Sequence, residues 1–380
     1  MAHVQETSQD PDVTAVIEAS GESTIENATK KAQDTIHDLL NVSLDVAVTG
    51  ETGAGKSTFI NAIRGLSDDD EGAAETGVTE TTTEPTPYQH PTMPNVTFWD
   101  LPGIGSRTFQ ANRYLQQVNF NRYDFFIIIS SVRFTENDVL LATEIRNQEK
   151  LFYFVRSKID VDVAQEARRQ GFNREATLAK IRNYCLAHLK DFKNPKVFLI
   201  CCYDVSAFDF EELVDTLVSE LPEHKRYALM KSVPVTSVAV LKRKVEMFDI
   251  LAWAAAFCSG VVAVAPVPGL SSACDVGIVV AFVTSCYFSF GLDNKSIERL
   301  SERVNKPHLK SVIKSPLVLK LASSLLKEFD VLDYFQKSEP GLSTLSAAIT
   351  SFEVIKKLLQ HALKEFEDAA LTVLREAGLE

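Results

Sequence analysis

The stretch TGETGAGKST, residues 49–58, decides how the first half of this sequence folds. It directly follows the apolar run at residues 44–48 and places three glycines beside one lysine. Residues 50–57 fit the pattern G-x-x-x-x-G-K-[ST], in which loop N–H groups and a helix N-terminus surround a phosphate. An apolar strand in front and the amphipathic segment STFINAIRG behind are the context that this loop requires. The stretch therefore predicts a phosphate-binding loop; an ordinary glycine-rich turn is the alternative.

The residue types of the loop predict how it meets a nucleotide. Lys56 neutralises the oxygens of the β- and γ-phosphates, and Ser57 offers a hydroxyl ligand to Mg²⁺. Glycine at positions 53 and 55 lets the backbone come close to the phosphates. The loop residues expected to contact nucleotide are Gly50, Glu51, Thr52, Gly53, Ala54, Gly55, Lys56, Ser57 and Thr58.

Two further motifs follow apolar strands. DLPG at residues 100–103 ends the run NVTFW, where Asp100 can hold Mg²⁺ through water and the Gly103 N–H can detect the γ-phosphate. SKID at residues 157–160 follows LFYFVR. Asp160 can accept two hydrogen bonds from guanine, a pair that adenine does not present, while the Lys158 stem packs over the base. The three motifs in this order predict a guanine nucleotide, and an ATP-dependent enzyme remains the alternative.

The pattern of elements predicts an α/β domain followed by an all-α domain. Short β-rich runs at 44–49, 95–99, 124–130, 151–155 and 196–200 alternate with amphipathic segments. This alternation is typical of a mostly parallel sheet with helices on both faces. After residue 222 the sequence favours helices only. The helices expected before residue 43 must bury an apolar stripe, and the C-terminal helices are the expected partner. The expected domains are N-terminal helices at 1–42, a nucleotide-binding domain at 43–222 and a C-terminal helical domain at 223–380.

Bulk composition narrows the class of protein. With 380 residues and a formal net charge of −12, the chain lacks the basic face of a nucleic-acid binder. Its six cysteines show neither metal-ligand spacing nor the density of a disulfide scaffold, which predicts reduced thiols. The polar N-terminus has no secretory pattern and no glycine at position 2, so we expect a cytoplasmic protein without N-myristoylation.

Several segments resemble the immunity-related GTPases, the interferon-inducible p47-type group. They are TGETGAGKSTFINAIRG, EGAAETGVTETT, NVTFWDLPGIGS, YDFFIIISSVRFTENDV, FYFVRSKID and, in the helical tail, LPEHKRYALMKSVP. GKS at residues 55–57 is similar to the effector branch and differs from the GMS regulator branch. The resemblance implies a Ras-like G domain joined to a helical domain built from both chain ends. It also implies GTP hydrolysis with Mg²⁺, dynamin-like assembly through the G domains, and cell-autonomous immunity at the membranes of intracellular pathogen vacuoles.

The resemblance adds candidate residues. Thr76 and Thr82 match family threonines in the segment that must deliver a hydroxyl to Mg²⁺ and the γ-phosphate, where Thr79, Thr81 and Thr83 compete. The predicted metal ligands are Ser57, Thr76 and Asp100, and the predicted catalytic residues are Lys56, Ser57, Thr76, Glu80, Thr82 and Gly103. Where the family has a base-contacting Ser-Asn turn, this sequence reads Cys201-Cys202-Tyr203-Asp204. We therefore expect Cys202 beside the guanine, with that contact left to backbone groups or to chance.

The residue after DLPG bears on the rate of hydrolysis. It is Ile104, where a glutamine would orient water, so intrinsic hydrolysis should be slow. Glu51, Glu80 and Arg133 are candidate contacts between two G domains that complete each other's sites, and an arginine supplied this way accelerates hydrolysis about 10³- to 10⁵-fold. The alternative is a nucleotide-gated scaffold with negligible turnover.

The region at residues 250–290 is the most apolar part of the chain. Two apolar runs flank PVPG at residues 266–269, and each is shorter than the ~20 residues that cross a bilayer. A buried helical hairpin is favoured, with a membrane hairpin as the alternative; peripheral recruitment to intracellular membranes follows from the resemblance. The amphipathic segment at 351–377 should pack its apolar face within the helical domain.

Overall fold

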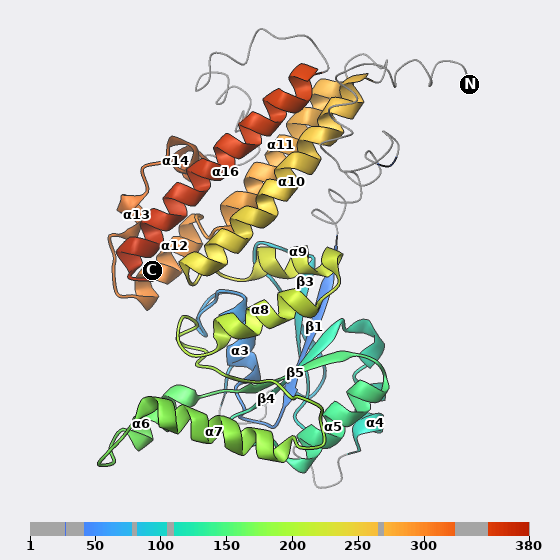
Figure 1. The fold of residues 1–380 in the computed structure, drawn as a ribbon, viewed down its shortest axis with the longest axis vertical. Coiled ribbons are helices and arrows are strands. Elements are labelled where there is room, and N and C mark those ends of the chain that lie inside the picture. The colour runs from blue at the N-terminus through green and yellow to red at the C-terminus, as the bar shows by residue number, and fades with distance from the viewer. Residues whose placement is uncertain are drawn as a thin grey trace, which may run out of the picture. The chain divides into compact units, whose positions relative to one another are not determined.

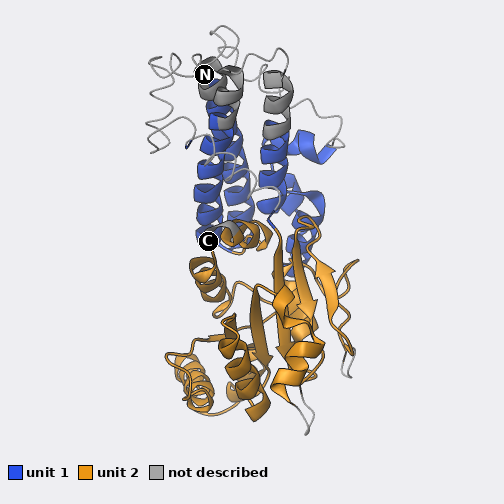
Figure 2. Ribbon diagram, turned by 90° about the vertical axis from the view of Figure 1, so that its right-hand side faces the viewer, with its two compact units in different colours: residues 1–42, 237–380 blue, residues 43–236 orange. Residues whose placement is uncertain are grey.

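The computed structural model describes residues 27, 42–77, 82–104, 110–264, 270–323 and 349–379. The chain divides into two compact units, residues 43–236 and residues 1–42 with 237–380, which Figure 2 colours separately. The domain limits expected from the sequence differ from these units by one helix, α9 (Glu223–Ser232), and stay a prediction. The predicted N-terminal helices lie outside the described residues except for Asn27.

The first unit is built on a six-stranded sheet in the order β2-β3-β1-β4-β5-β6 (Figure 1). The strands are β1 (Leu44–Gly50), β2 (Thr86–Gln89), β3 (Val96–Asp100), β4 (Phe125–Ser130), β5 (Leu151–Arg156) and β6 (Val197–Leu199). Neighbouring strands are parallel except β2, which runs antiparallel to β3. Five of these strands coincide with the predicted β-rich runs, which confirms the α/β fold class.

Helices cover both faces of this sheet, which explains why its central strands are mostly apolar. Every residue of β4 is buried. The helices of this unit are α3 (Lys56–Ile63), α4 (Ala111–Gln117), α5 (Glu136–Asn147), α6 (Ile159–Glu166), α7 (Arg174–His188), α8 (Phe210–Glu220) and α9, with a 3₁₀ turn at Phe120–Arg122. One face carries a core built from α4, α5 and α7. On the other face, Phe59 of α3 meets Phe210 of α8 with ring centroids 6.3 Å apart.

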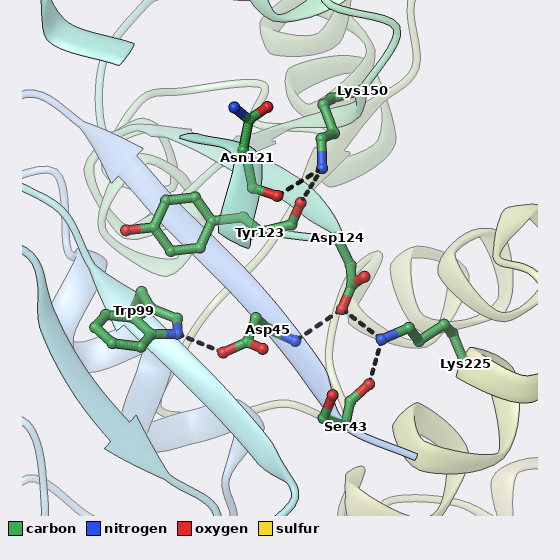
Figure 3. Close-up of polar contacts among 8 residues, drawn as sticks. All are labelled: Ser43, Asp45, Trp99, Asn121, Tyr123, Asp124, Lys150 and Lys225. Carbon is green, nitrogen blue, oxygen red and sulfur yellow. Dashed lines mark hydrogen bonds and ion pairs between the residues drawn. The ribbon is translucent and has the colours of Figure 1, made fainter. Parts of the chain in front are cut away.

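A polar cluster, drawn in Figure 3, ties α9 to the N-terminal ends of the strands. Asp124 Oδ2 accepts hydrogen bonds from the backbone N–H of Asp45, at 2.9 Å, and from Lys225 Nζ, at 3.0 Å. Lys225 also donates to the carbonyl of Ser43, and Trp99 Nε1 donates to Asp45 Oδ1 at 2.8 Å. We call these five residues the Asp124 cluster. It ties the starts of β1 and β4 to α9, and the predicted phosphate loop follows the other end of β1.

The second unit is helical in the residues that the structure describes. Its helices are α10 (Val238–Val264), α11 (Leu270–Ser289), α12 (Asn294–Arg303), α13 (Leu309–Val312), α14 (Pro316–Ser323) and α16 (Ile349–Ala377). The helices α10, α11 and α16 pack against one another. Leu359, Ala362 and Phe366 of α16 are fully buried, so the predicted apolar face of the C-terminal helix does pack within the helical unit.

The apolar region at 250–290 contributes core residues to this unit. Leu251, Phe257 and Phe282 are buried, and Phe282 packs edge-on against Phe248. Over the described residues, none of the helices has the combination of length and hydropathy needed to span a bilayer. Residues 265–269 and the side chains at 258–278 lie outside what the structure describes.

Candidate nucleotide-binding site

The loop between β1 and α3 presents an open helix N-terminus. Gly55 adopts φ 92°, a left-handed conformation that other residues rarely take, immediately before α3 begins at Lys56. No side chain caps this helix, and its first turn contains no acidic residue. The partial positive charge of the helix end is therefore available to an anion, as the sequence predicted for this loop.

Lys56 lies inside the loop that it terminates. Its side chain is buried, and Nζ donates to the carbonyl oxygens of Gly50 and Glu51, both at 3.3 Å. The ammonium group is thus held across the start of the loop by backbone acceptors. This position suits a cation that neutralises phosphate oxygens within the loop.

Ser57 and Asp100 meet beside the loop. Ser57 Oγ donates to Asp100 Oδ2 at 2.6 Å, and Thr82 Oγ1 donates to the same oxygen at 3.1 Å. Burial raises the pKa of Asp100, while the two hydroxyls and the charge of Lys56 oppose the shift. The other carboxylate oxygen, Oδ1, is buried and has no hydrogen-bond partner among the described residues. A buried acceptor of this kind next to a serine hydroxyl fits Mg²⁺ or one of its water ligands.

The structure brings one of the two favoured threonines to this place. Thr82 is the residue that contacts Asp100, whereas Thr76 is exposed on the segment before the gap at residues 78–81. Glu80, Thr79 and Thr81 fall in that gap and lie outside the described residues. The ligand set expected from the sequence, with Thr76, stays a prediction.

The DLPG segment is fixed against the phosphate loop. A Cβ placed on Gly103 would lie 2.5 Å from Thr52 Oγ1 and 3.2 Å from the Thr52 nitrogen, so a side chain here would require Thr52 or the segment to shift. Tyr114 of α4 shares a 3.0 Å hydrogen bond with Thr49 Oγ1 and donates to the Pro102 carbonyl at 2.8 Å. Sequence analysis missed Tyr114, because nothing local indicates that its hydroxyl bridges two separate segments.

The SKID segment contacts the opposite wall of the loop. Lys158 Nζ donates to the Gly53 carbonyl at 2.9 Å, and Ser157 Oγ donates to the Ala54 carbonyl at 2.6 Å. The serine hydroxyl that begins this segment therefore reaches the loop. Cys202 is half-buried, and burial raises the pKa of its thiol, with the charge of Asp160 acting in the same direction and Lys158 opposing. The predicted base-contacting residues thus gather on one side of the loop.

The proposed contacts between G domains are only partly described. Glu51 and Arg133 are exposed, and Arg133 precedes α5. Asp138 in the first turn of α5 is fully buried and forms a capping box with Thr135. Burial raises the pKa of Asp138 to about 6, and the negative charge of Glu51 adds to the shift. Sequence analysis did not single out Asp138, although Thr followed three residues later by Asp is a capping signal.

A third missed residue, Arg156, ends β5 directly before the SKID segment. It is 4% exposed and donates to the Ser157 carbonyl and to Asp162 Oδ2, both at 2.5 Å. A charged residue at the end of the apolar strand LFYFVR was the available signal. Its partner six residues later could not be recognised without the geometry of the turn.

The sheet order, the loop after β1 and the aspartate at the end of β3 define a P-loop nucleotide-binding protein. The profile of the family Interferon-inducible GTPase (IIGP) matches residues 10–377, and the chain belongs to this family of GTPases.

Two curated relatives support this assignment over most of the chain. Interferon-inducible GTPase 5 of Rattus norvegicus is 41% identical over 345 residues, which cover 87% of this chain and 74% of that protein. Interferon-inducible GTPase 1 of Mus musculus is 40% identical over 295 residues, which cover 76% of this chain and 71% of that protein. Among solved structures, Era in complex with MgGDPNP and an RNA matches 48% of this chain and 58% of its own, at 17% identity and a TM-score of 0.33, too low to support an argument.

Proposed function

We propose that this GTPase binds GTP with Mg²⁺ in the loop at residues 50–57, hydrolyses it, and pairs with a second copy through its G domain in the GTP state. The proposal extends to action in cell-autonomous immunity, with a cytoplasmic protein recruited to the membranes of intracellular pathogen vacuoles. Family membership supports the GTPase activity. One observation supports the proposed nucleotide and metal site: Ser57 contacts Asp100 beside a helix N-terminus that no side chain caps.

The metal site is proposed from the donor set. Ser57 Oγ and Asp100, directly or through water, would hold Mg²⁺, together with a threonine from the segment at 76–82. The unpartnered Asp100 Oδ1 supports this choice, because a buried carboxylate oxygen without a donor is costly. When bound, Mg²⁺ neutralises charge on the β- and γ-phosphate oxygens.

The protein groups have separate tasks in this proposal. Lys56 stabilises the phosphate charge that develops during hydrolysis, and the Gly103 N–H contacts the γ-phosphate. Asp160 accepts from guanine, Lys158 packs over the base, and Cys202 lies beside it. Glu80 and the exposed residues Glu51 and Arg133 are the proposed contacts between copies.

The central experiment measures phosphate release and light scattering in one sample. With Mg²⁺ and GTP, the specific activity should rise with protein concentration, and scattering should rise with GTP and fall as GTP is consumed. Lys56→Ala should abolish both signals because nucleotide no longer binds. A specific activity that stays flat at protein concentrations far above the dissociation constant of the nucleotide would overturn activation by pairing.

A nucleotide-gated scaffold is the second candidate function. The presence of Ile104, which cannot orient water, favours it. Under multiple-turnover conditions the scaffold would bind GTP and scatter light without releasing more than one phosphate per site. The GTPase proposal predicts continuous release, so the same sample distinguishes the two.

Recruitment to membranes has its own test. Vesicles of anionic and neutral phospholipid, mixed with the full chain, are floated through a density gradient in the presence of GDP or a non-hydrolysable GTP analogue. Co-flotation only with the GTP analogue supports recruitment in the assembled state. Equal recovery with both nucleotides, or none with either, contradicts it.

A further inference from the structure

Arg156 is a buried cation placed next to the segment that is proposed to read guanine. Its guanidinium donates to the Ser157 carbonyl through Nη1 and to Asp162 Oδ2 through Nη2. The Nε atom is buried and has no hydrogen-bond partner among the described residues. Burial lowers the pKa of Arg156, and Asp162 opposes the shift. Burying a charge at the end of an apolar strand costs desolvation free energy, so packing alone does not explain why an arginine stands at position 156.

The two hydrogen bonds of Arg156 close a bridge over the residues between Ser157 and Asp162. Lys158 and Asp160 lie within this span. Lys158 adopts φ 57°, a left-handed conformation that is unfavourable for a residue with a side chain. Such a backbone persists only where its surroundings hold it in place.

The segment is held from two sides. Ser157 Oγ is bound to the phosphate loop at the Ala54 carbonyl, and the Ser157 carbonyl is bound to Arg156. Asp162 and Asp160 both belong to the first turn of α6, so fixing Asp162 also fixes the backbone that carries the Asp160 carboxylate. The bridge therefore acts on the orientation of Asp160 without touching a nucleotide.

We propose that the Arg156–Asp162 pair is a positioning device for guanine specificity. It holds the Asp160 carboxylate where it accepts both the N1–H and the 2-amino group of the base. This inference rests on the proposed role of Asp160. Both oxygens must be aligned at once to accept two parallel hydrogen bonds, so a small rotation of the turn loses the second bond before the first.

Hypoxanthine supplies the probe, because it keeps the N1–H and lacks the 2-amino group. The experiment measures the dissociation constants of GDP and IDP by competition with a fluorescent GDP, using the full chain. The wild type should prefer GDP by about tenfold or more, the range for a hydrogen bond to a charged group. Arg156→Met should lower the GDP-to-IDP preference to about two- to threefold, with IDP affinity nearly unchanged because the phosphate loop is intact.

Matched variants separate positioning from stability. Arg156→Lys retains the charge but cannot donate to both acceptors through two fixed nitrogens, so it should give an intermediate GDP-to-IDP preference. Arg182→Met removes a comparable pair, in which Arg182 Nη2 lies 2.6 Å from Asp209 and Nη1 donates to the Val197 carbonyl. This control should keep the wild-type preference even where the melting temperature falls.

Two outcomes overturn the inference. One is a folded Arg156→Met protein with the wild-type preference. If that variant fails to fold, Asp162→Asn replaces it, because the amide keeps the shape and weakens the pair; an unchanged preference in Asp162→Asn then has the same meaning. Asp160→Asn distinguishes this failure from that of the proposed function. A shift of Asp160→Asn toward xanthine nucleotide leaves the base assignment intact, whereas an unchanged preference for guanine refutes that assignment.

Discussion

Ser57 Oγ donates a 2.6 Å hydrogen bond to Asp100 Oδ2, and this contact joins the start of α3 to the end of β3. Two elements separated by more than forty residues thereby present their polar atoms to the same corner of the phosphate loop. The metal proposal depends on this corner, and it leads to the first prediction.

Asp100→Asn should remove the dependence of GTP binding on Mg²⁺. The amide retains a hydrogen bond with Ser57 but carries no charge to attract a divalent cation. Calorimetry with a non-hydrolysable GTP analogue should show wild-type affinity falling by about tenfold or more on adding EDTA, and little change for the variant. A variant that loses affinity with EDTA as strongly as the wild type would contradict the assignment.

Gly103→Ala should weaken binding of the GTP analogue more than binding of GDP. The added Cβ would lie 2.5 Å from Thr52 Oγ1 and 3.2 Å from the Thr52 nitrogen, so the Thr52 side chain must rotate and the DLPG segment must shift from the loop by a small distance. Overpacking of this kind also costs about 1–3 kcal/mol of folding free energy. Thr52→Ala in the same chain removes the closest atom and should restore part of both losses. Strictly additive effects of the two substitutions would show that the contact is unimportant.

Tyr114→Phe should lower the free energy of unfolding by about 1–3 kcal/mol, because the buried Thr49 hydroxyl and the Pro102 carbonyl lose a partner. Urea unfolding followed by circular dichroism provides the measurement. Tyr184→Phe is the matched control, since Tyr184 is 47% exposed. Equal midpoints for the wild type and Tyr114→Phe would argue against a structural role for the bridge.

Asp138→Asn should flatten part of the pH dependence of stability. Because the folded state holds the pKa of Asp138 near 6, above the ordinary value of 3.8, the folded protein binds this proton more tightly than the unfolded chain does. Stability contributed by this group therefore falls as pH rises from about 4 to 6, by about 3 kcal/mol in total, and is constant above.

Thermal unfolding of both proteins between pH 4 and 8 checks this prediction. Other carboxylates titrate in the same range, so the informative quantity is the difference between the wild type and Asp138→Asn. The variant should gain stability relative to the wild type as pH rises to about 6. A difference that does not change with pH would mean that Asp138 titrates as an ordinary carboxyl group.

The parallel strands and the phosphate loop were predictable because their signals are local. β4 is apolar at almost every position since both of its faces are covered, and residues 50–57 carry the loop pattern in consecutive positions. β2 was not predicted: it is a four-residue edge strand with Pro87 inside it, and a proline inside a run weakens the signal for a strand.

The side-chain contacts of the site were less accessible to sequence reasoning. Five threonines compete between residues 76 and 83, and only the folded chain brings Thr82 to Asp100. Tyr114 makes its contacts through tertiary structure, and Arg156 meets Asp162 only through the turn between them, so neither was recognised as part of a motif. The roles of the base-contacting residues stay predictions, although Ser157 and Lys158 do contact the loop.

The Asp124 cluster anchors the N-terminal end of β1. This strand is seven residues long, about 20 Å, and carries the phosphate loop at one end. At its other end, Lys225 of α9 donates hydrogen bonds to the Ser43 carbonyl and to Asp124 Oδ2. Because α9 is the last described helix of the unit at residues 43–236, the strand that carries the phosphate loop is tied at its other end to the helix that closes this unit.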